Sequence, residues 1–348
     1  MEEVSTAASA SRVALRIETA LGQPILLREQ EIFPAVSIGI ALNHSSYLQP
    51  GEILRDADIA LYRAKALGRG RHEVFDADLG EQALALLHLE TDLRRALRDG
   101  EFRLVYQPIL SLDHRTLHGF EALVRWQHPT RGLLPPGEFI PLAEETGLIV
   151  PMGAWVLREA TRQGRLWQDA RPASEPLTMS VNLSSRQFSH PDLPALVEAA
   201  LSESGLPPSC LELEVTESVL IDNPQAAQQV LERFREMGIR LALDDFGTGY
   251  SALSYLHRFP FQTLKIDRSF ISGIDPDGKN PAIVRAIVTL AENLGMEAVA
   301  EGVELESEED LLRQLHCRYV QGFLYARPMD PQAAEQWLRL PLADLITA

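Results

Sequence analysis

Polar and charged side chains end a series of apolar, strand-like segments in the last two-thirds of the 348-residue sequence. The clearest case is the segment 298–301, in which Ala-Val-Ala is followed by Glu301. The other side chains in this setting are Glu121, Asn182, Glu214, Asp244, Asp245, Lys265 and Gln321. If the strands are parallel and close into a barrel, their carboxyl ends meet at one rim, and these side chains converge there.

Carboxylates that converge in this way raise one another's pKa values unless cations neutralise them. The set offers hard oxygen ligands and no His or Cys, which favours Mg²⁺ or Mn²⁺ over zinc. Two such ions that share a bridging aspartate can drive an in-line phosphodiester displacement. Taken singly, the residues have simpler explanations, because Asn182 could cap a helix and Asp244-Asp245 could form a turn. The spacing by itself therefore indicates metal-dependent phosphoryl or sugar chemistry and nothing narrower.

The elements that must position these residues begin at residue 102, where short β-rich runs alternate with amphipathic stretches. We expect strands at 102–109, 117–125, 177–183, 211–216, 239–244, 262–266, 296–300 and 318–321. We expect helices at 138–146, 153–168, 191–203, 224–237, 251–257, 280–294, 307–315 and 331–339. Eight such units in about 240 residues predict an α/β fold, a (β/α)8 TIM-type barrel with parallel strands. Only residues 110–116 separate the first two strands, which predicts an antiparallel hairpin there.

The residues before the barrel have a different pattern. A buried strand is expected at 34–42, and a helix at 51–68 ends at a Gly-Arg-Gly stop. A second helix at 80–99 is expected to connect this region to the barrel. Asp56 and Asp58 in the first helix are expected on a solvated face.

Composition excludes several classes of protein. The chain has 32 Lys and Arg against 49 Asp and Glu, and its net charge of −17 would repel nucleic acid or an anionic membrane. Cys210 and Cys317 have no C-x-x-C spacing, so neither a disulfide framework nor a thiolate zinc site is indicated. No apolar stretch approaches the roughly 18 residues of a membrane span. We therefore expect a cytoplasmic protein that binds no DNA or RNA and has no membrane segment in this chain.

Ordered motifs over residues 85–340 resemble the EAL domain of bacterial cyclic di-GMP phosphodiesterases. Residues 121–126 form the E-A-L-x-R-W signature. Further agreement in the expected order is found at 139–147, 181–184, 214–217, 244–250, 264–267, 301–304 and 321–323. The resemblance implies a (β/α)8 barrel with an antiparallel first strand and the hydrolysis of one phosphodiester bond of cyclic di-GMP, giving linear pGpG.

The same resemblance implies a site that holds two divalent metal ions, Mg²⁺ or Mn²⁺. The ligands of the first ion would be Glu121, Asn182, Glu214 and Asp244. The ligands of the second ion would be Asp244, Asp245 and Glu301, so that Asp244 bridges the two.

The remaining roles come from the resemblance as well. Lys265 would hold the attacking water as hydroxide, and Arg125 would bind a substrate phosphate. Gln321 would lie beside the water or the substrate, and Glu217 would position the loop that contains Gly247.

Residues 11–77 resemble the C-terminal part of a GGDEF, or diguanylate cyclase, domain. No G-G-[DE]-E-F segment occurs, so we expect no cyclase activity. We divide the chain into a partial GGDEF-like segment at 1–79, a connecting helix at 80–100 and an EAL barrel at 101–340. Because half of an α/β domain leaves apolar surface uncovered, we expect the native protein to continue upstream of Met1, and a longer, membrane-tethered protein is one form that it could take. If the chain is native as given, we expect residues 1–80 to pack on the barrel or on a partner, or to be partly disordered.

An alternative function is a receptor or interaction module that binds cyclic di-GMP without cleaving it. The complete set of ligand positions together with Lys265 favours the enzyme, because a receptor needs no water activator. EAL domains commonly pair, and the helix expected at 251–257 is a candidate contact for a homodimer.

Overall fold

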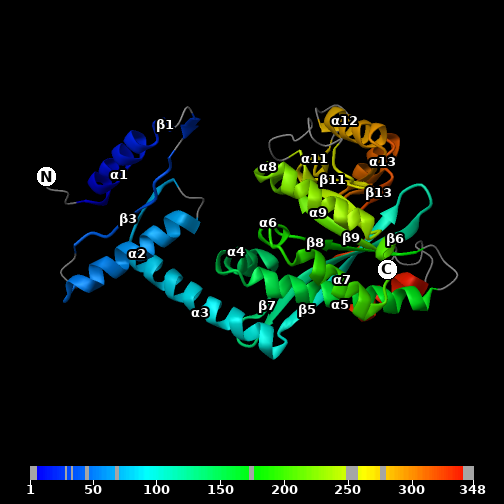
Figure 1. Ribbon diagram of the computed structural model, residues 1–348, viewed down its shortest axis with the longest axis horizontal. Coiled ribbons are helices and arrows are strands. Elements are labelled where there is room, and N and C mark those ends of the chain that lie inside the picture. The colour runs from blue at the N-terminus through cyan, green and yellow to red at the C-terminus, as the bar shows by residue number, and fades with distance from the viewer. Residues whose placement is uncertain are drawn as a thin grey trace. The chain divides into compact units, whose positions relative to one another are not determined.

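The structure is a computed structural model, and it describes residues 6–27, 30–32, 34–43, 47–66, 70–171, 176–247, 258–274 and 280–339. The chain divides into two compact units, Met1–Asp92 and Leu93–Ala348. Helix α3 (Ala77–Asp99) contains the boundary between them (Figure 1). This helix is the connecting helix expected from residue 80 onward.

Eight strands of the second unit form a closed barrel, which confirms the predicted fold. The strands are β5 (Phe102–Ser111), β6 (Thr116–His128), β8 (Thr178–Asn182), β9 (Leu211–Thr216), β10 (Arg240–Phe246), β11 (Thr263–Ile266), β12 (Glu297–Ala300) and β13 (Tyr319–Val320). Their order around the barrel is β5, β13, β12, β11, β10, β9, β8 and β6, and pairing of β5 with β6 closes the sheet. Strand β5 is antiparallel to both of its neighbours, whereas the other barrel pairs are parallel. The short connection at 112–115 is a turn, as its length requires.

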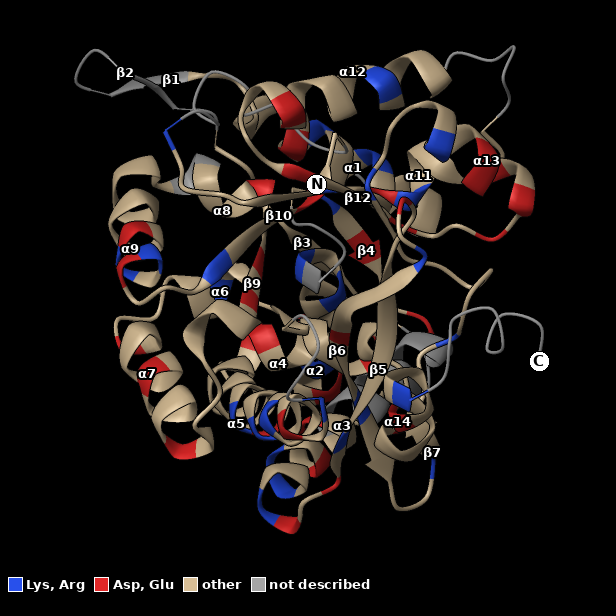
Figure 2. Ribbon diagram, turned by 90° about the vertical axis from the view of Figure 1, so that its right-hand side faces the viewer, with Lys and Arg blue, Asp and Glu red and all other residues tan. Residues whose placement is uncertain are grey.

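The helices that follow the strands lie close to their expected positions. They are α4 (Pro136–Thr146), α5 (Ile149–Ala170), α7 (Leu193–Ser204), α9 (Pro224–Glu236), α12 (Asn280–Asn293), α13 (Glu306–Gln314) and α14 (Pro331–Arg339). Figure 2 shows α7, α9, α12 and α13 around the barrel strands, with residues of both charge signs on α9 and α13. The helix expected at 251–257 lies outside the described residues.

Several short elements are not among those expected from the sequence. They are β7 (Gly132–Leu134), α6 (Ser185–Phe188), the 3-10 turn at Pro208–Cys210, α8 (Glu217–Asp222) and α11 (Arg268–Ile271). Strand β7 pairs with the end of β6 and adds one strand to the sheet outside the closed barrel. Segments this short contain too few residues for a hydrophobic period to be recognised.

The sequence Leu-Glu-Leu-Glu-Val of β9 explains how a buried strand carries charge to the centre of the barrel. Side chains alternate between the two faces of a strand. Leu211, Leu213 and Val215 belong to the apolar core. The alternate residues Glu212 and Glu214 are also buried, and they point into the barrel.

Inside the barrel, the polar side chains nearer the amino ends of the strands form a network in which acidic and basic groups are paired. Arg240 donates to Glu212 over 3.2 Å and to Glu297 over 2.7 Å. Ser180 and Thr263 also donate to Glu212. Arg318 also donates to Glu297 over 3.0 Å, so two arginines balance the two glutamates of this layer.

The first unit has a smaller set of elements. These are α1 (Ala7–Leu21), the antiparallel pair β1 (Ile25–Leu27) and β2 (Gln30–Ile32), and the parallel pair β3 (Ile38–Ile40) and β4 (His72–Val74), with α2 (Pro50–Ala66) between the last two strands. The expected strand at 34–42 is thus shorter, and the expected helix at 51–68 is present. One expectation for α2 is wrong, because Asp56 is buried and accepts a hydrogen bond from the Tyr47 hydroxyl over 2.8 Å. Asp58 is exposed, as expected.

Candidate functional site

Lys265 lies at the centre of a group of carboxylates at the carboxyl ends of the barrel strands. Its side chain comes from β11 and is buried, with 1% of the residue exposed. The Nζ atom lies 2.6 Å from Glu214 Oε2 and 2.6 Å from Glu301 Oε1. It lies 3.5 Å from Asp244 Oδ1 and 3.8 Å from Glu121 Oε2. We call Lys265 and the five carboxylates Glu121, Glu214, Asp244, Asp245 and Glu301 the rim cluster.

The electrostatics of the rim cluster follow from burial and an excess of negative charge. Burial by itself lowers the pKa of the Lys265 ammonium, but attraction to Asp244 and the neighbouring glutamates outweighs burial and raises that pKa above its usual value. Burial raises the pKa of Glu214, and it raises the pKa of Glu301 to about 8, although Lys265 opposes both shifts. Burial and the nearby Asp244 raise the pKa of Asp245. One ammonium therefore does not neutralise the site, and further positive charge would stabilise it.

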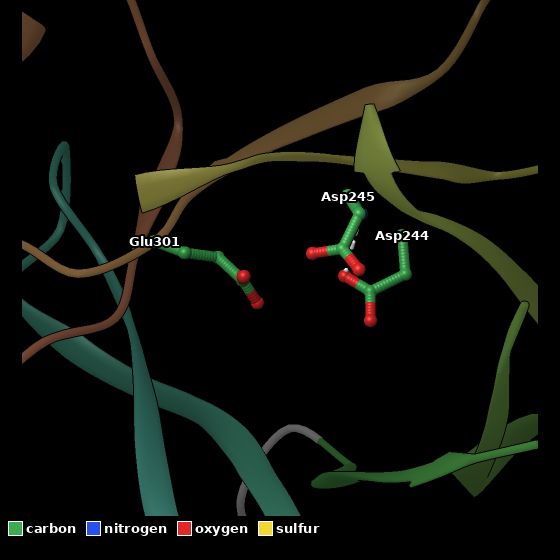
Figure 3. Close-up of side chains that lie close together, drawn as sticks. All are labelled: Asp244, Asp245 and Glu301. Carbon is green, nitrogen blue, oxygen red and sulfur yellow. Dashed lines mark hydrogen bonds between the residues drawn. The ribbon is translucent and has the colours of Figure 1, made fainter. Parts of the chain in front are cut away.

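A backbone irregularity brings Asp244 and Asp245 to the same site. Consecutive side chains of a regular strand point to opposite faces. The register of β10 against β11 shifts between Leu243 and Phe246, and Asp245 has a φ of +53°. The amide of Asp245 donates to Asp244 Oδ1 over 3.0 Å. Such a bulge can redirect a side chain, and both carboxylates here face Glu301 (Figure 3).

The rim cluster fits divalent cations. Asp244, Asp245 and Glu301 each offer an oxygen, and these oxygens all lie within 4.8 Å of one another. Within the described part of the chain, the buried Oε1 of Glu214 has no hydrogen-bond partner. Carboxylate oxygens are the ligands that Mg²⁺ and Mn²⁺ prefer. The residues can therefore hold such ions, with Asp244, Asp245 and Glu301 as one set of ligands.

Side-chain amides hold Glu121 in place. Asn182 Nδ2 donates to Glu121 Oε1 over 2.6 Å, and Gln321 Nε2 donates to Glu121 Oε2 over 2.6 Å. Gln321 also donates to Gln107 Oε1 over 3.0 Å. Sequence reasoning missed Gln107, although the predicted hairpin could have revealed it, because Gln107 is the register partner of Glu121 across β5 and β6.

Two further predicted residues lie at the edge of the site. Glu217 begins α8 and accepts a hydrogen bond from the Gly247 amide over 3.0 Å. Gly247 has a φ of +98°, and a Cβ there would lie 2.9 Å from the Phe270 ring, so the position requires glycine. Residues 248–250 of the same loop lie outside the described residues.

Arg125, which the resemblance implies as a phosphate ligand, is not among the described residues that line the cavity beside the rim cluster. Its guanidinium donates to the Val124 carbonyl over 2.8 Å, and burial lowers its pKa. The cavity has a volume of about 300 Å³ and is lined by Leu123, which lies two residues earlier on the same face of β6. Among the described residues, the cations that line this cavity are Lys265 and Arg268.

The fold and the site define a (β/α)8 barrel protein with a cluster of carboxylates around a lysine at the carboxyl ends of its strands. Residues 90–328 match the EAL domain, and residues 1–71 match the diguanylate cyclase GGDEF domain. The chain belongs to the EAL domain family, with a GGDEF region before the barrel. Both resemblances found in the sequence are thereby confirmed.

The chain is similar to several named relatives. It is 44% identical over 336 residues to the bifunctional diguanylate cyclase/cyclic di-GMP phosphodiesterase MucR of Pseudomonas aeruginosa, covering 97% of this chain and 48% of MucR. It is 39% identical over 327 residues to the cyclic di-GMP phosphodiesterase PdeR of Escherichia coli, covering 94% of this chain and 49% of PdeR. The chain thus spans about half the length of these curated relatives.

Solved structures agree with the sequence comparison. A cyclic di-GMP complex of the PaMucR phosphodiesterase matches with a TM-score of 0.68 and 47% identity, covering 71% of this chain and 99% of that one. The EAL enzyme Bd1971, with cAMP and cyclic di-GMP bound, matches with a TM-score of 0.71 and 33% identity, covering 85% of this chain and 77% of that one. In the described part of the chain, no helix has the length and apolar character to cross a membrane.

Proposed function

We propose that the chain hydrolyses one phosphodiester bond of cyclic di-GMP to give linear pGpG with the help of two divalent ions, Mg²⁺ or Mn²⁺. The observation that carries the proposal is the rim cluster, in which four carboxylates lie within 3.8 Å of Lys265 Nζ, with Asp245 beside them at the carboxyl ends of the strands. The names of the relatives MucR and PdeR support the choice of substrate.

In the proposed reaction, water adds to phosphorus and the P–O3′ bond breaks, so that the linear product keeps a 5′-phosphate. When bound, divalent ions supply positive charge that polarises the phosphodiester and favours deprotonation of the attacking water. The proposed ligands are Glu121, Asn182, Glu214 and Asp244 for one ion and Asp244, Asp245 and Glu301 for the other.

The other polar residues of the site act on water and substrate. Lys265 Nζ donates a hydrogen bond to the attacking water and stabilises the negative charge that develops on its oxygen. Gln321 orients Glu121 and the bound substrate. Glu217 fixes the loop through the Gly247 amide. Arg125 binds a substrate phosphate after its guanidinium leaves the Val124 carbonyl.

The experiment is incubation of the purified chain with cyclic di-GMP and Mg²⁺ or Mn²⁺, with a chelator control and chromatographic detection of products. The proposal predicts pGpG that forms only without chelator. Tight binding of cyclic di-GMP without cleavage would instead support the alternative, a receptor or interaction module.

The N-terminal region leads to a second, negative proposal. The sequence contains no G-G-[DE]-E-F segment, so we propose that the region makes no cyclic di-GMP from GTP. Formation of cyclic di-GMP from GTP by the purified chain would contradict this. We propose a partial GGDEF-like segment at 1–79, a connecting helix at 80–100 and an EAL barrel at 101–340.

We also propose a homodimer that pairs through residues 251–257 and a cytoplasmic location for this part of the protein. Sedimentation velocity tests the first point. A monomer at micromolar concentration would contradict it.

A further inference from the structure

We propose that Arg268 is a substrate-binding residue. In the free protein Glu304 holds its guanidinium in place, and the second, non-scissile phosphate of the cyclic dinucleotide replaces Glu304 as its partner. This inference rests on the proposed function, because it assumes that the substrate is cyclic di-GMP. The cavity lined by Glu121, Asp244, Lys265 and Glu301 of the rim cluster is also lined by Arg268 and Glu304. Neither Arg268 nor Glu304 has a role in the proposed reaction.

The lining of the cavity offers few cations to a substrate phosphate. The acidic residues of its lining are Glu121, Asp244, Glu301 and Glu304. Lys265 also lines the cavity, but it is buried and lies 2.6 Å from each of two carboxylates, so it is not available to a distant phosphate. Arg268 has a side chain that is 55% exposed. It is therefore the cation of the described lining that an entering anion can reach.

Glycine at position 302 seats Arg268 against the site. Gly302 directly follows Glu301 and has a φ of +69°, and a Cβ at this position would lie 2.3 Å from Arg268 Cγ. The aliphatic part of the arginine thus lies directly on the backbone beside a rim carboxylate. Any residue with a side chain at 302 would displace the aliphatic part of Arg268 from this position.

A buried carboxylate fixes the two segments that carry the pair. Glu308 is 2% exposed, and its oxygens accept hydrogen bonds from the amides of Gly273, Glu304 and Leu305 over 2.9, 2.8 and 3.1 Å. Gly273 follows α11, which begins with Arg268, whereas Glu304 follows β12. Arg268 and Glu304 therefore face each other on clamped segments, and only their side chains need to move.

The contact between Arg268 and Glu304 suits an exchange of partners. Arg268 Nη2 lies 2.8 Å from Glu304 Oε1, and the Glu304 side chain is 39% exposed. Ion pairs as exposed as this contribute little to stability. A guanidinium can bind phosphate through two parallel hydrogen bonds. Its contact with Glu304 is through one nitrogen, so a phosphate can offer Arg268 a better partner.

The test is steady-state hydrolysis of cyclic di-GMP by R268A, R268K, E304Q and the R268A/E304Q double variant. We expect R268A to raise KM about 10- to 100-fold, the range for a lost hydrogen-bonded charge, with a smaller effect on kcat. R268K keeps the charge but not the fork, so it should have an intermediate KM. E304Q should lower KM, because it releases the guanidinium, and it should have no such effect in the R268A background.

A second measurement does not depend on turnover. Calorimetric binding of the product pGpG should weaken in R268A and tighten in E304Q. The matched control is R285A, which removes an exposed arginine from α12 without touching the cavity. It should bind and cleave like the wild type.

The outcomes separate this inference from the proposed function. If the wild-type chain cleaves cyclic di-GMP and R268A has the same KM as the wild type, the role of Arg268 is overturned and the proposed function is not. An E304Q variant with a raised KM would show that the pair is structural, and would also overturn the role of Arg268. A wild-type chain that neither binds nor cleaves cyclic di-GMP overturns the proposed function and this inference with it.

Discussion

Asp244 and Asp245 are consecutive residues of β10, yet both carboxylates face Glu301 across the barrel rim (Figure 3). The register shift after Leu243 and the positive φ of Asp245 make this possible. One strand end thus contributes two carboxylates to the rim cluster. Several measurable consequences arise from this arrangement and from Lys265 beside it.

Replacing Asp244 with Asn should lower the rate of cyclic di-GMP hydrolysis by about a thousandfold, because a charged ligand of both proposed ions is lost. The shape of the side chain is kept, so the fold should be retained. The matched control is D310N, which changes an exposed aspartate of α13. Hydrolysis by D244N at a rate similar to that of D310N would contradict the role of Asp244.

Replacing Lys265 with Met should destabilise the metal-free protein by about 3–5 kcal/mol, because buried carboxylates lose their cation. Saturating Mg²⁺ or Mn²⁺ should restore much of the stability, since the ions supply the missing charge. Urea unfolding with and without the metal measures both effects. A variant as stable as the wild type in chelator would show that Lys265 does not hold the rim cluster together.

The stability of the metal-free protein should depend on pH through Glu301. The pKa of Glu301 is raised to about 8, mainly by burial, so the folded chain holds a proton that the unfolded chain releases. Its contribution to stability is complete below the usual glutamate pKa and is lost as the pH rises through about 8. The free energy of unfolding in chelator should therefore fall over that interval.

Bound metal should remove most of this pH dependence, because the ion takes the place of the proton. The control is E301Q, which has no proton to lose. If E301Q in chelator shows the same fall in stability as the wild type, Glu301 is not its cause.

Replacing Glu217 with Ala should lower kcat about tenfold, because the Gly247 amide loses its acceptor and the following loop is no longer fixed. The barrel should remain folded, since α8 is short and lies outside the strands. Thermal unfolding and kinetics on the same sample separate the two effects. Unchanged kinetics would show that this contact does not govern turnover.

Much of this architecture could be predicted from the sequence. The alternation of strands and helices indicated the barrel, and apolar strands that end in acids, such as the one followed by Glu301, indicated that carboxylates gather at its rim. Gln107 was missed because it lies within an apolar strand, and only its register opposite Glu121 brings it to the site. Arg268 was missed because its position depends on a close approach to Gly302, which no residue spacing reveals.

Local pattern was misleading at Asp56. This residue seemed solvated, since its helix is rich in charge, but the hydroxyl of Tyr47 satisfies it in a buried position. That hydrogen bond forms only in the folded chain.

The central claim is that the rim cluster binds two divalent ions and that hydrolysis depends on them. Mn²⁺ should be titrated into metal-free protein, with bound ions counted by electron paramagnetic resonance and pGpG measured on the same samples. The account predicts two ions per chain and activity that rises with their occupancy. Full activity in chelator, or Mn²⁺ binding that D244N leaves unchanged, would contradict it.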